Sequence, residues 1–476
     1  MTRNPDGKQS LALEPVLKIA RSGDRAYHGA RIAVVPVGRV PSRGAFVDFQ
    51  DTLLAAVGDR CFAAIIRYLL WVWLFVALPS SSTAENWPCW RGPRLDGTSH
   101  EQGVPVHWSA TSNVVWKTAL PGAGHASPIV WADRVFTVTA LLDTQERVLL
   151  CLDRRTGKIL WRKTVVTAPL EKKHSLNSHA SSTPATDGQR VYVAFLDRRE
   201  MVVAAYDFAG HQQWLARPGP FQSMHGFCSS PILYQDKVIV NGDHDGDSYL
   251  VALDRADGKT LWKTPRENHT RSYCVPIIRE LAGRTQMVLS GDKCVASYDP
   301  NDGSRHWIID GPTEQFVASI VYNERAGLLF VTGGFPDHHI LAVRPDGRGN
   351  VTDTKIVWRT NKGVAYVPSP ISAGDYFLVV SDSGVAHCFE AASGKLLWQE
   401  RMGEHHASLV SAGGRVYFLN DEGVMNVVAP GPYFVPVARN ELGERTFASP
   451  AISAGQLFLR GDKHLFCIGE TRPAEK

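Results

Sequence analysis

The chain alternates short apolar segments with polar turns, and one strand–turn–strand phrase recurs along it. In residues 149–161 an alternating segment ends at Asp153, a polar turn passes through Gly157, and a second apolar segment ends at Trp161. Alternation of period two is typical of a β-strand with unlike faces, and Asp followed by Gly is typical of a hairpin turn. Because a lone hairpin is too small to bury a Trp side chain, we expect adjacent copies to cover one another.

The phrase returns several times, which indicates a repeat protein. Strong copies occupy residues 249–262, 294–307 and 386–398. A degenerate copy occupies 202–214, and a longer variant occupies 340–358. The copies lie roughly 40–50 residues apart, a period that is typical of the four-stranded blades of a β-propeller.

A second marker opens each repeat. It is a short segment with Ser–Pro or a similar pair of small residues, and a second short strand follows it. Together with the closing hairpin, the marker gives four strands to each unit. The markers occupy residues 125–130, 181–186, 228–233, 273–278, 316–322, 367–372, 406–411 and 447–452.

We therefore predict an all-β fold, an eight-bladed β-propeller of four-stranded antiparallel blades. The last marker is not followed by a fourth strand, whereas the strand around Trp116 is preceded by no marker. We expect this N-terminal strand to complete the last blade, because the pairing removes two exposed sheet edges. The Trp residues that should dock each blade on the next are Trp116, Trp161, Trp214, Trp262, Trp307, Trp358 and Trp398.

The residues ahead of the repeats predict export. Arg60 and Arg67 precede an apolar run at 68–78, and a small-x-small motif ends at Ala84. This order is typical of a secretory signal peptide, and the run is short for a membrane span, which needs about 20 residues. We expect the protein in the periplasm or cell envelope, and at a membrane only if the apolar run is not cleaved.

These features divide the chain into five parts. Residues 1–56 show no core pattern, and we hypothesise that translation starts downstream of this unassigned leader. The other parts are a signal peptide or anchor (57–84), an N-terminal segment that should lie across the rim or base of the propeller (85–112), the propeller (113–470) and a tail (471–476).

Charge and cysteine content exclude some classes of function. Residues 1–84 carry ten Lys/Arg and six Asp/Glu, whereas residues 85–476 carry forty-one of each. The repeat region is therefore formally neutral and has no electrostatic footprint for a nucleic acid. Seven Cys follow the apolar run without any CxxC motif, which favours small buried side chains over metal ligands or a disulfide framework.

The repeated L-D-x-x-T/D-G-K-x-L-W phrase resembles the repeat of the pyrroloquinoline-quinone (PQQ) enzymes, and residues 87–99 resemble the start of exported PQQ-like propellers. The resemblance covers nearly all of residues 85–470 and implies eight blades, each Trp held against the neighbouring blade. It does not imply one function, because the family contains PQQ-dependent alcohol and sugar dehydrogenases and also the cofactor-free propeller of the outer-membrane barrel-assembly machinery.

The resemblance also implies features of the dehydrogenases that this chain lacks. Those enzymes have adjacent cysteines over the quinone, a Glu/Asn/Asp cluster for Ca²⁺ and a catalytic Asp. No Cys–Cys pair is present, and no motif allows the other residues to be assigned. The repeated Asp residues, such as Asp153 and Asp254, are interpreted as turn formers.

Two sets of residues are candidates for ligand or metal binding. Six His precede the blade markers and could meet at the mouth of the central channel, where imidazoles bind a metal or an anion; the alternative is local hydrogen bonding at the rim. They are His125, His179, His225, His269, His405 and His406. Asp243, Asp245 and Asp247 alternate like half of a calcium loop, and the alternative is a polar hairpin tip in the third blade.

Our leading functional prediction is an exported, non-catalytic scaffold that binds a small ligand or an envelope protein. The first alternative is a PQQ-dependent oxidoreductase, with PQQ and Ca²⁺ as its cofactors. The second is a metal-binding protein that uses the six His residues. An apolar patch on the rim would favour the scaffold, whereas clustered Ca²⁺ ligands and a Trp platform would favour the enzyme.

Overall fold

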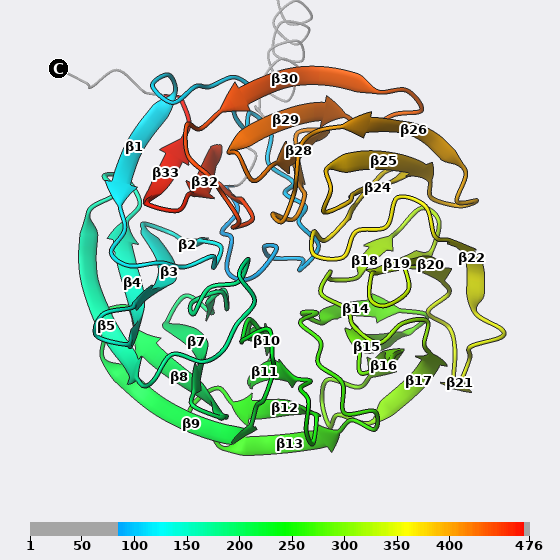
Figure 1. The fold of residues 1–476 in the computed structure, drawn as a ribbon, viewed down its shortest axis with the longest axis horizontal. Helices are drawn as coiled ribbons and strands as arrows, with labels where there is room; N and C mark the ends of the chain where they lie inside the picture. The colour runs from blue at the N-terminus through cyan, green and yellow to red at the C-terminus, as the bar shows by residue number, and fades with distance from the viewer. Residues whose placement is uncertain (1–83, 471–476) are drawn as a thin grey trace, which may run out of the picture. The chain divides into compact units, whose positions relative to one another are not determined.

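The computed structural model describes residues 84–470, which form a closed ring of eight β-sheets (Figure 1). This confirms the prediction of an all-β, eight-bladed propeller. The leader, the signal segment up to Thr83 and the tail lie outside the described residues. Within residues 84–470, no helix is long and apolar enough to cross a membrane.

Each of the first four blades follows the order of the chain from its innermost strand outward. Blade 1 comprises β2 (Ile129–Trp131), β3 (Arg134–Leu141), β4 (Glu146–Asp153) and β5 (Ile159–Thr167). Blade 2 comprises β6 (Ala185–Thr186), β7 (Arg190–Asp197), β8 (Glu200–Asp207) and β9 (Gln212–Pro220). Blade 3 comprises β10 (Ile232–Tyr234), β11 (Lys237–Gly242), β12 (Tyr249–Asp254) and β13 (Thr260–Pro265). Blade 4 comprises β14 (Ile277–Leu281), β15 (Arg284–Gly291), β16 (Cys294–Tyr298) and β17 (Arg305–Asp310), with β21 (Gly349–Asn350) added at its edge.

The next three blades repeat this order. Blade 5 comprises β18 (Val321–Asn323), β19 (Leu328–Gly333), β20 (His339–Val343) and β22 (Ile356–Thr360). Blade 6 comprises β23 (Ile371–Ala373), β24 (Tyr376–Val380), β25 (Val385–Glu390) and β26 (Leu396–Arg401). Blade 7 comprises β27 (Val410–Ala412), β28 (Arg415–Leu419), β29 (Val424–Ala429) and β30 (Val435–Glu441).

The last blade joins the two ends of the repeat region. It comprises β31 (Ala451–Ser453), β32 (Gln456–Arg460), β33 (His464–Ile468) and, outermost, β1 (Val114–Ala119). β1 pairs antiparallel with β33, with Trp116 opposite Cys467 and Ala119 opposite His464 (Figure 1). The predicted closure by the N-terminal strand is therefore confirmed.

The Trp residues dock consecutive blades through their indole N–H groups. Six of the seven predicted docking residues donate to a carbonyl in the outer hairpin turn of the next blade. The repeat therefore needs a Trp in one blade and a turn in the blade that follows. The pairs are Trp116 with Arg154 (2.7 Å), Trp161 with Phe208 (2.9 Å), Trp214 with Arg255 (3.1 Å), Trp262 with Pro300 (3.2 Å), Trp358 with Ala391 (3.0 Å) and Trp398 with Gly431 (3.0 Å).

Trp307 departs from this arrangement. Its indole N–H donates to Gln286 Oε1 at 2.8 Å within its own blade, and its side chain is fully buried. The hairpin of the next blade lacks the short Gly turn; its longer excursion instead lays β21 alongside β17, with Gly349 opposite Trp307. Trp307 therefore makes no indole hydrogen bond to the next blade, whose excursion pairs with β17 instead, and its docking role stays a prediction.

The blade markers have a structural role at the inner strands. A hydroxyl side chain in one marker accepts a hydrogen bond from the backbone N–H at the same position of the preceding blade. The donor–acceptor pairs are Ser127–Thr183 (3.1 Å), Thr183–Ser230 (2.8 Å), Ser319–Ser369 (2.9 Å), Ser369–Ser408 (3.0 Å) and Ser408–Ser449 (2.8 Å). Blade 4 has Val275 at this position, so the belt of hydrogen bonds is interrupted there.

The N-terminal segment (85–112) lies across one end of the inner strands. Trp87 is buried and exchanges backbone hydrogen bonds with Val130 in β2. Arg91 is also buried and donates to the carbonyls of Ser369 (3.2 Å) and Pro370 (2.5 Å), ahead of β23. Further contacts reach Thr186, Ser411 and Gly455. Because these contacts reach blades around the ring, the segment spans the axis of the propeller.

Candidate functional site

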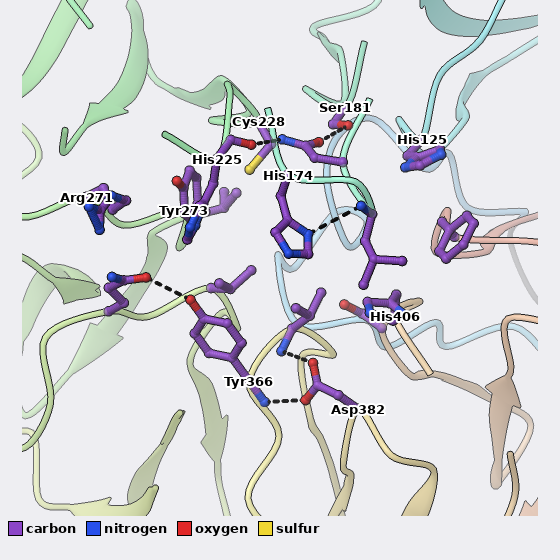
Figure 2. A pocket seen from close by; sticks show the side chains of 18 of the residues that line it. His125, His174, Ser181, His225, Cys228, Arg271, Tyr273, Tyr366, Asp382 and His406 are labelled. Carbon is purple, nitrogen blue, oxygen red and sulfur yellow. Dashed lines mark hydrogen bonds between the residues drawn. The ribbon is translucent and has the colours of Figure 1, made fainter. Parts of the chain in front are cut away.

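A pocket of about 840 Å³ lies where the inner strands of the blades begin (Figure 2). Every blade contributes a residue to its wall from the marker or the loop ahead of it. Trp90 of the N-terminal segment also lines the pocket and donates its indole N–H to Ser319 at 3.1 Å. The end of the ring opposite to this segment is therefore the side from which a ligand would approach.

Three exposed apolar side chains line the pocket, together with the exposed polar residues His174 and Glu314. Leu176, Met224 and Phe335 line it and are 42%, 48% and 52% exposed. Large apolar side chains with this exposure are unfavourable in water, and when they gather at one opening they indicate a binding surface. Loops of blades 2, 3 and 5 thus supply exposed apolar side chains to the pocket.

His406 forms a dyad with a buried carboxylate on one wall. Its Nδ1 lies 2.6 Å from Asp421 Oδ2, and its backbone N–H donates to Asp421 Oδ1 at 2.9 Å. Burial acts against protonation, but the hydrogen bond to Asp421 and the charge of Asp421 raise the pKa of His406 above its ordinary value. Since Asp421 holds Nδ1, Nε2 is the ring nitrogen left for a ligand.

His125 has the opposite electrostatic character. Burial, followed by the positive charge of Arg460, lowers the pKa of His125 to about 4. His125 and His406 both pack on Phe447, with ring centroids 4.8 Å and 5.6 Å from it. At neutral pH the pocket therefore presents one neutral imidazole and one that protonates more readily, both packed on Phe447.

The facing walls carry further polar groups. Asp382 accepts the backbone N–H groups of Tyr366 (2.7 Å) and Val367 (3.1 Å), and burial raises the pKa of its carboxyl group. Arg271 pairs with Asp245 at 2.8 Å. The Tyr273 hydroxyl lies 2.5 Å from Ser223 Oγ. Figure 2 shows these side chains around the same space as the His residues.

Three of the six predicted His residues line the pocket: His125, His225 and His406. The other three do not. His179 lies 3.2 Å from the buried side chain of Glu171, and His269 is exposed and contacts the Gly246 carbonyl at 2.9 Å. His405 is fully buried, with its Nδ1 2.5 Å from the Gly403 carbonyl. The loops ahead of the inner strands differ in length, so equal distance from a marker does not give equal position in space.

Sequence reasoning missed several wall residues, including His174, Arg271, Tyr273, Tyr366 and Asp382. Arg271 and Tyr366 stand immediately before or at a marker, which is the signal that identified the His residues. Asp382 enters from the turn between β24 and β25, for which no pattern was available. Within residues 84–470, no three His, Cys, Asp or Glu side chains are placed to hold one metal ion.

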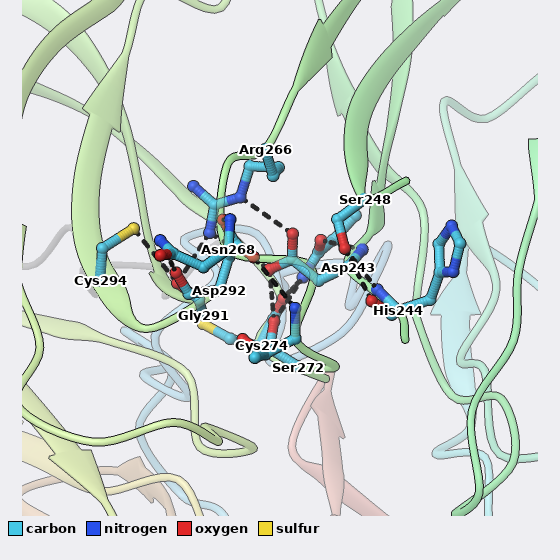
Figure 3. Close-up of polar contacts among 12 residues, drawn as sticks. Asp243, His244, Ser248, Arg266, Asn268, Ser272, Cys274, Gly291, Asp292 and Cys294 are labelled. Carbon is cyan, nitrogen blue, oxygen red and sulfur yellow. Dashed lines mark hydrogen bonds and ion pairs between the residues drawn. The ribbon is translucent and has the colours of Figure 1, made fainter. Parts of the chain in front are cut away.

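The three candidate calcium ligands have separate partners. Asp243 is fully buried and forms an ion pair with Arg266, Nε to Oδ1 at 2.9 Å, and it also accepts from Ser272 at 2.7 Å (Figure 3). Asp245 pairs with Arg271, and the side chain of Asp247 is fully exposed. All three lie between β11 and β12, at the tip of the central hairpin of blade 3.

The sequence matches a known protein family over more than half of its length. Residues 144–348 and 336–429 match the PQQ_2 family, which carries the description "Outer membrane protein assembly factor BamB". The fold is that of a repeat propeller, and the chain belongs to this family. No curated protein matches the sequence.

Solved structures share the fold at low sequence identity. BamB from Moraxella catarrhalis superposes with a TM-score of 0.53 and 14% identity, over 74% of this chain and 98% of that one. Quinohemoprotein alcohol dehydrogenase from Comamonas testosteroni gives 0.48 and 12%, over 84% and 83%. A europium-containing methanol dehydrogenase gives 0.48 and 12%, over 80% and 90%. The likeness to BamB shows the fold alone.

The residues present do not fit a PQQ–calcium group. Among the described residues no set of carboxylates converges on a cation position. Asp382, a carboxylate of the pocket wall, is already held by two backbone amides. Cys228, which lines the pocket, is a free thiol with no adjacent Cys.

Proposed function

We propose that this chain is an exported, non-catalytic scaffold of the cell envelope, and that it binds a small ligand or a partner protein at the pocket where the inner strands begin. The signal-like segment and the family support the envelope as its location. The observation that carries the proposal is one pocket that combines exposed apolar side chains with buried polar groups.

The chemistry of this pocket suits recognition. Leu176, Met224 and Phe335 would cover an apolar part of the ligand. Each is already about half buried, so completing its burial would contribute about half of the roughly 1.5–3 kcal/mol that full burial gives. The polar groups below them would give orientation and specificity, since His406, Arg271 and Tyr273 supply donors in a sheltered site. Recognition of a ligand in this way does not require a catalytic nucleophile.

The experiment places a photoreactive amino acid at Phe335 in the full chain and identifies what it captures in the cell envelope. A matched chain carries the same group at Leu160, which is 40% exposed on an outer strand away from the pocket. We expect one specific adduct from position 335, abolished by Met224→Asp, and none from position 160. Equal capture at both positions would contradict the proposal.

Native mass spectrometry of the purified protein separates the alternatives. Retained PQQ, followed by dye-linked oxidation of alcohols or sugars after addition of PQQ and Ca²⁺, would favour the oxidoreductase. A retained transition metal lost in the His125→Ala or His406→Ala chain would favour the metal-binding protein. A protein free of both that still gives the position-335 adduct supports the scaffold.

A further inference from the structure

The buried carboxylate of Glu101 lacks a cationic partner. Glu101 is 2% exposed, and its oxygens accept the backbone N–H groups of Ala454 (2.6 Å), Gly455 (2.5 Å) and Glu85 (2.6 Å). Among residues 84–470, no Lys, Arg or His nitrogen forms an ion pair with it within 4.0 Å, and the charge of Arg154 acts on it only from farther away. A charge removed from water is costly unless an opposite charge compensates it, so this site calls for a cation.

The third of those donors belongs to the residue that follows the signal-like segment. Glu85 is firmly held: its carboxylate binds Arg94 through two hydrogen bonds of 2.7 and 2.8 Å, and its carbonyl accepts from Ser453 at 2.6 Å. The hydrogen bond with Arg94 lowers the pKa of Glu85 to about 2, although burial acts against this. Ala84, one residue earlier, is exposed.

Sequence and structure select the same peptide bond. The small-x-small motif Ser82-Thr83-Ala84 places the cleavage point of a signal peptidase after Ala84. The structure independently places the backbone nitrogen of the next residue against a buried carboxylate. We infer that the chain is cleaved between Ala84 and Glu85, and that the new α-ammonium group of Glu85 forms a buried ion pair with Glu101.

The chemistry is an ordinary peptide hydrolysis. A peptidase adds water across the Ala84–Glu85 bond; the carboxylate leaves with Ala84, and the amine of Glu85 takes up a proton. The nitrogen already lies 2.6 Å from Glu101 Oε1, so a hydrogen bond from a neutral amide to the carboxylate becomes an ion pair without movement of either residue. Because Glu101 also holds the turn between β31 and β32, processing strengthens the attachment of the N-terminal segment to the last blade.

This inference does not depend on what the pocket binds. It predicts that the protein recovered from the envelope has Glu85 as its N-terminal residue. It also predicts that a chain beginning at Glu85 is more stable than a chain beginning at Ala84, in which the same charge is moved one residue outward. We expect about a tenfold difference in the unfolding equilibrium constant, which is about 1.4 kcal/mol.

Two controls test the ion pair, a substitution at Glu101 and the pH dependence of the stability of the two chains. Glu101→Gln should abolish the difference between the two chains, since it removes the charge and keeps an oxygen acceptor. If that variant does not fold, the pH dependence of the two unaltered chains provides the test. The advantage of the Glu85 chain should be full below the ordinary α-amino pKa of about 8 and should be lost as pH rises above it. A different mature N-terminus, or equal stability of the two chains at neutral pH, would overturn the inference.

Discussion

The indole ring of Trp116 lies directly against Gly157 of the neighbouring blade. A Cβ atom at Gly157 would stand 2.6 Å from the ring atom Cδ2, and the residue has a φ of +72°. Gly157 therefore serves two needs at once, the left-handed turn and the space for the indole. The same contact recurs at Gly258 with Trp214 and at Gly394 with Trp358. This explains why Gly and Trp appear together in the repeat, one in each of two adjacent units.

The substitution Gly157→Ala tests this relationship. We expect a loss of about 2–4 kcal/mol in the free energy of unfolding, because the left-handed conformation and the contact with Trp116 both become unfavourable. Gly414→Ala is the matched control: its φ is +70°, but a Cβ there meets nothing within 4 Å. Denaturant unfolding of both variants should show a clearly smaller loss for Gly414→Ala. Equal losses would mean that the indole contact contributes nothing.

The sequence predicted the architecture well because the repeat is local. Each short segment of the repeat shows three features: a Trp that its own hairpin cannot cover, a Gly turn and a hydroxyl before the inner strand. Counting these features gives eight blades and the closure through Trp116. The environment of Trp307 could not be predicted, because it depends on the path of residues 344–355, which no local pattern describes.

The pocket was only partly predictable, for a related reason. The position ahead of each marker identified His125, His225 and His406, which do line the pocket. His179 failed the same rule, since the long loop before β6 brings His174 to the wall instead. Which loop residue faces the axis is decided by loop length and packing, and neither has a sequence periodicity.

The side chain of Gln286 should be essential to blade 4. It accepts from Trp307 (2.8 Å) and Ser297 (2.7 Å) and donates to the carbonyls of Leu281 and Pro345, both at 2.9 Å. Gln286→Leu would leave these groups unpaired in a fully buried site, with an expected loss of at least about 2 kcal/mol. Gln213→Leu, at an exposed position with hydrogen bonds on the outer surface, should lose less than about 0.5 kcal/mol in the same thermal or chemical unfolding assay. Similar losses for the two would show that Gln286 is not needed as a hydrogen-bonding centre.

The Asp243–Arg266 ion pair should behave as a buried structural contact. Arg266 also donates to Tyr298 at 2.6 Å and to the Gly291 carbonyl at 2.9 Å, so it links blades 3 and 4. Figure 3 shows Arg266 with Asp243 and Gly291. Asp243→Asn leaves the guanidinium without its counter-charge, and we expect a loss of about 3–5 kcal/mol in the free energy of unfolding. The exposed pair of Arg325 and Asp375 gives the control, since Asp375→Asn should cost less than about 1 kcal/mol.

Addition of Ca²⁺ distinguishes this contact from the calcium hypothesis. A structural ion pair predicts that Ca²⁺ raises the stability of neither the unaltered chain nor Asp243→Asn. A calcium site that includes Asp243 predicts that Ca²⁺ stabilises the unaltered chain and that the substitution abolishes the effect.

The two imidazoles that pack on Phe447, those of His125 and His406, should titrate far apart. The pKa of His406 is raised above 6.5 by Asp421 against the effect of burial, and that of His125 is lowered to about 4 by burial and Arg460. For His406 the stabilisation is full below pH 6.5 and is lost as pH rises through the raised pKa; for His125 stability is lost as pH falls from 6.5 toward 4. Proton NMR of the two rings, assigned with His406→Gln and His125→Gln, measures both transitions directly. Asp421→Asn should bring the His406 transition down while that of His125 stays well below 6.5, and coincident transitions near 6.5 in the unaltered protein would show that neither environment is formed.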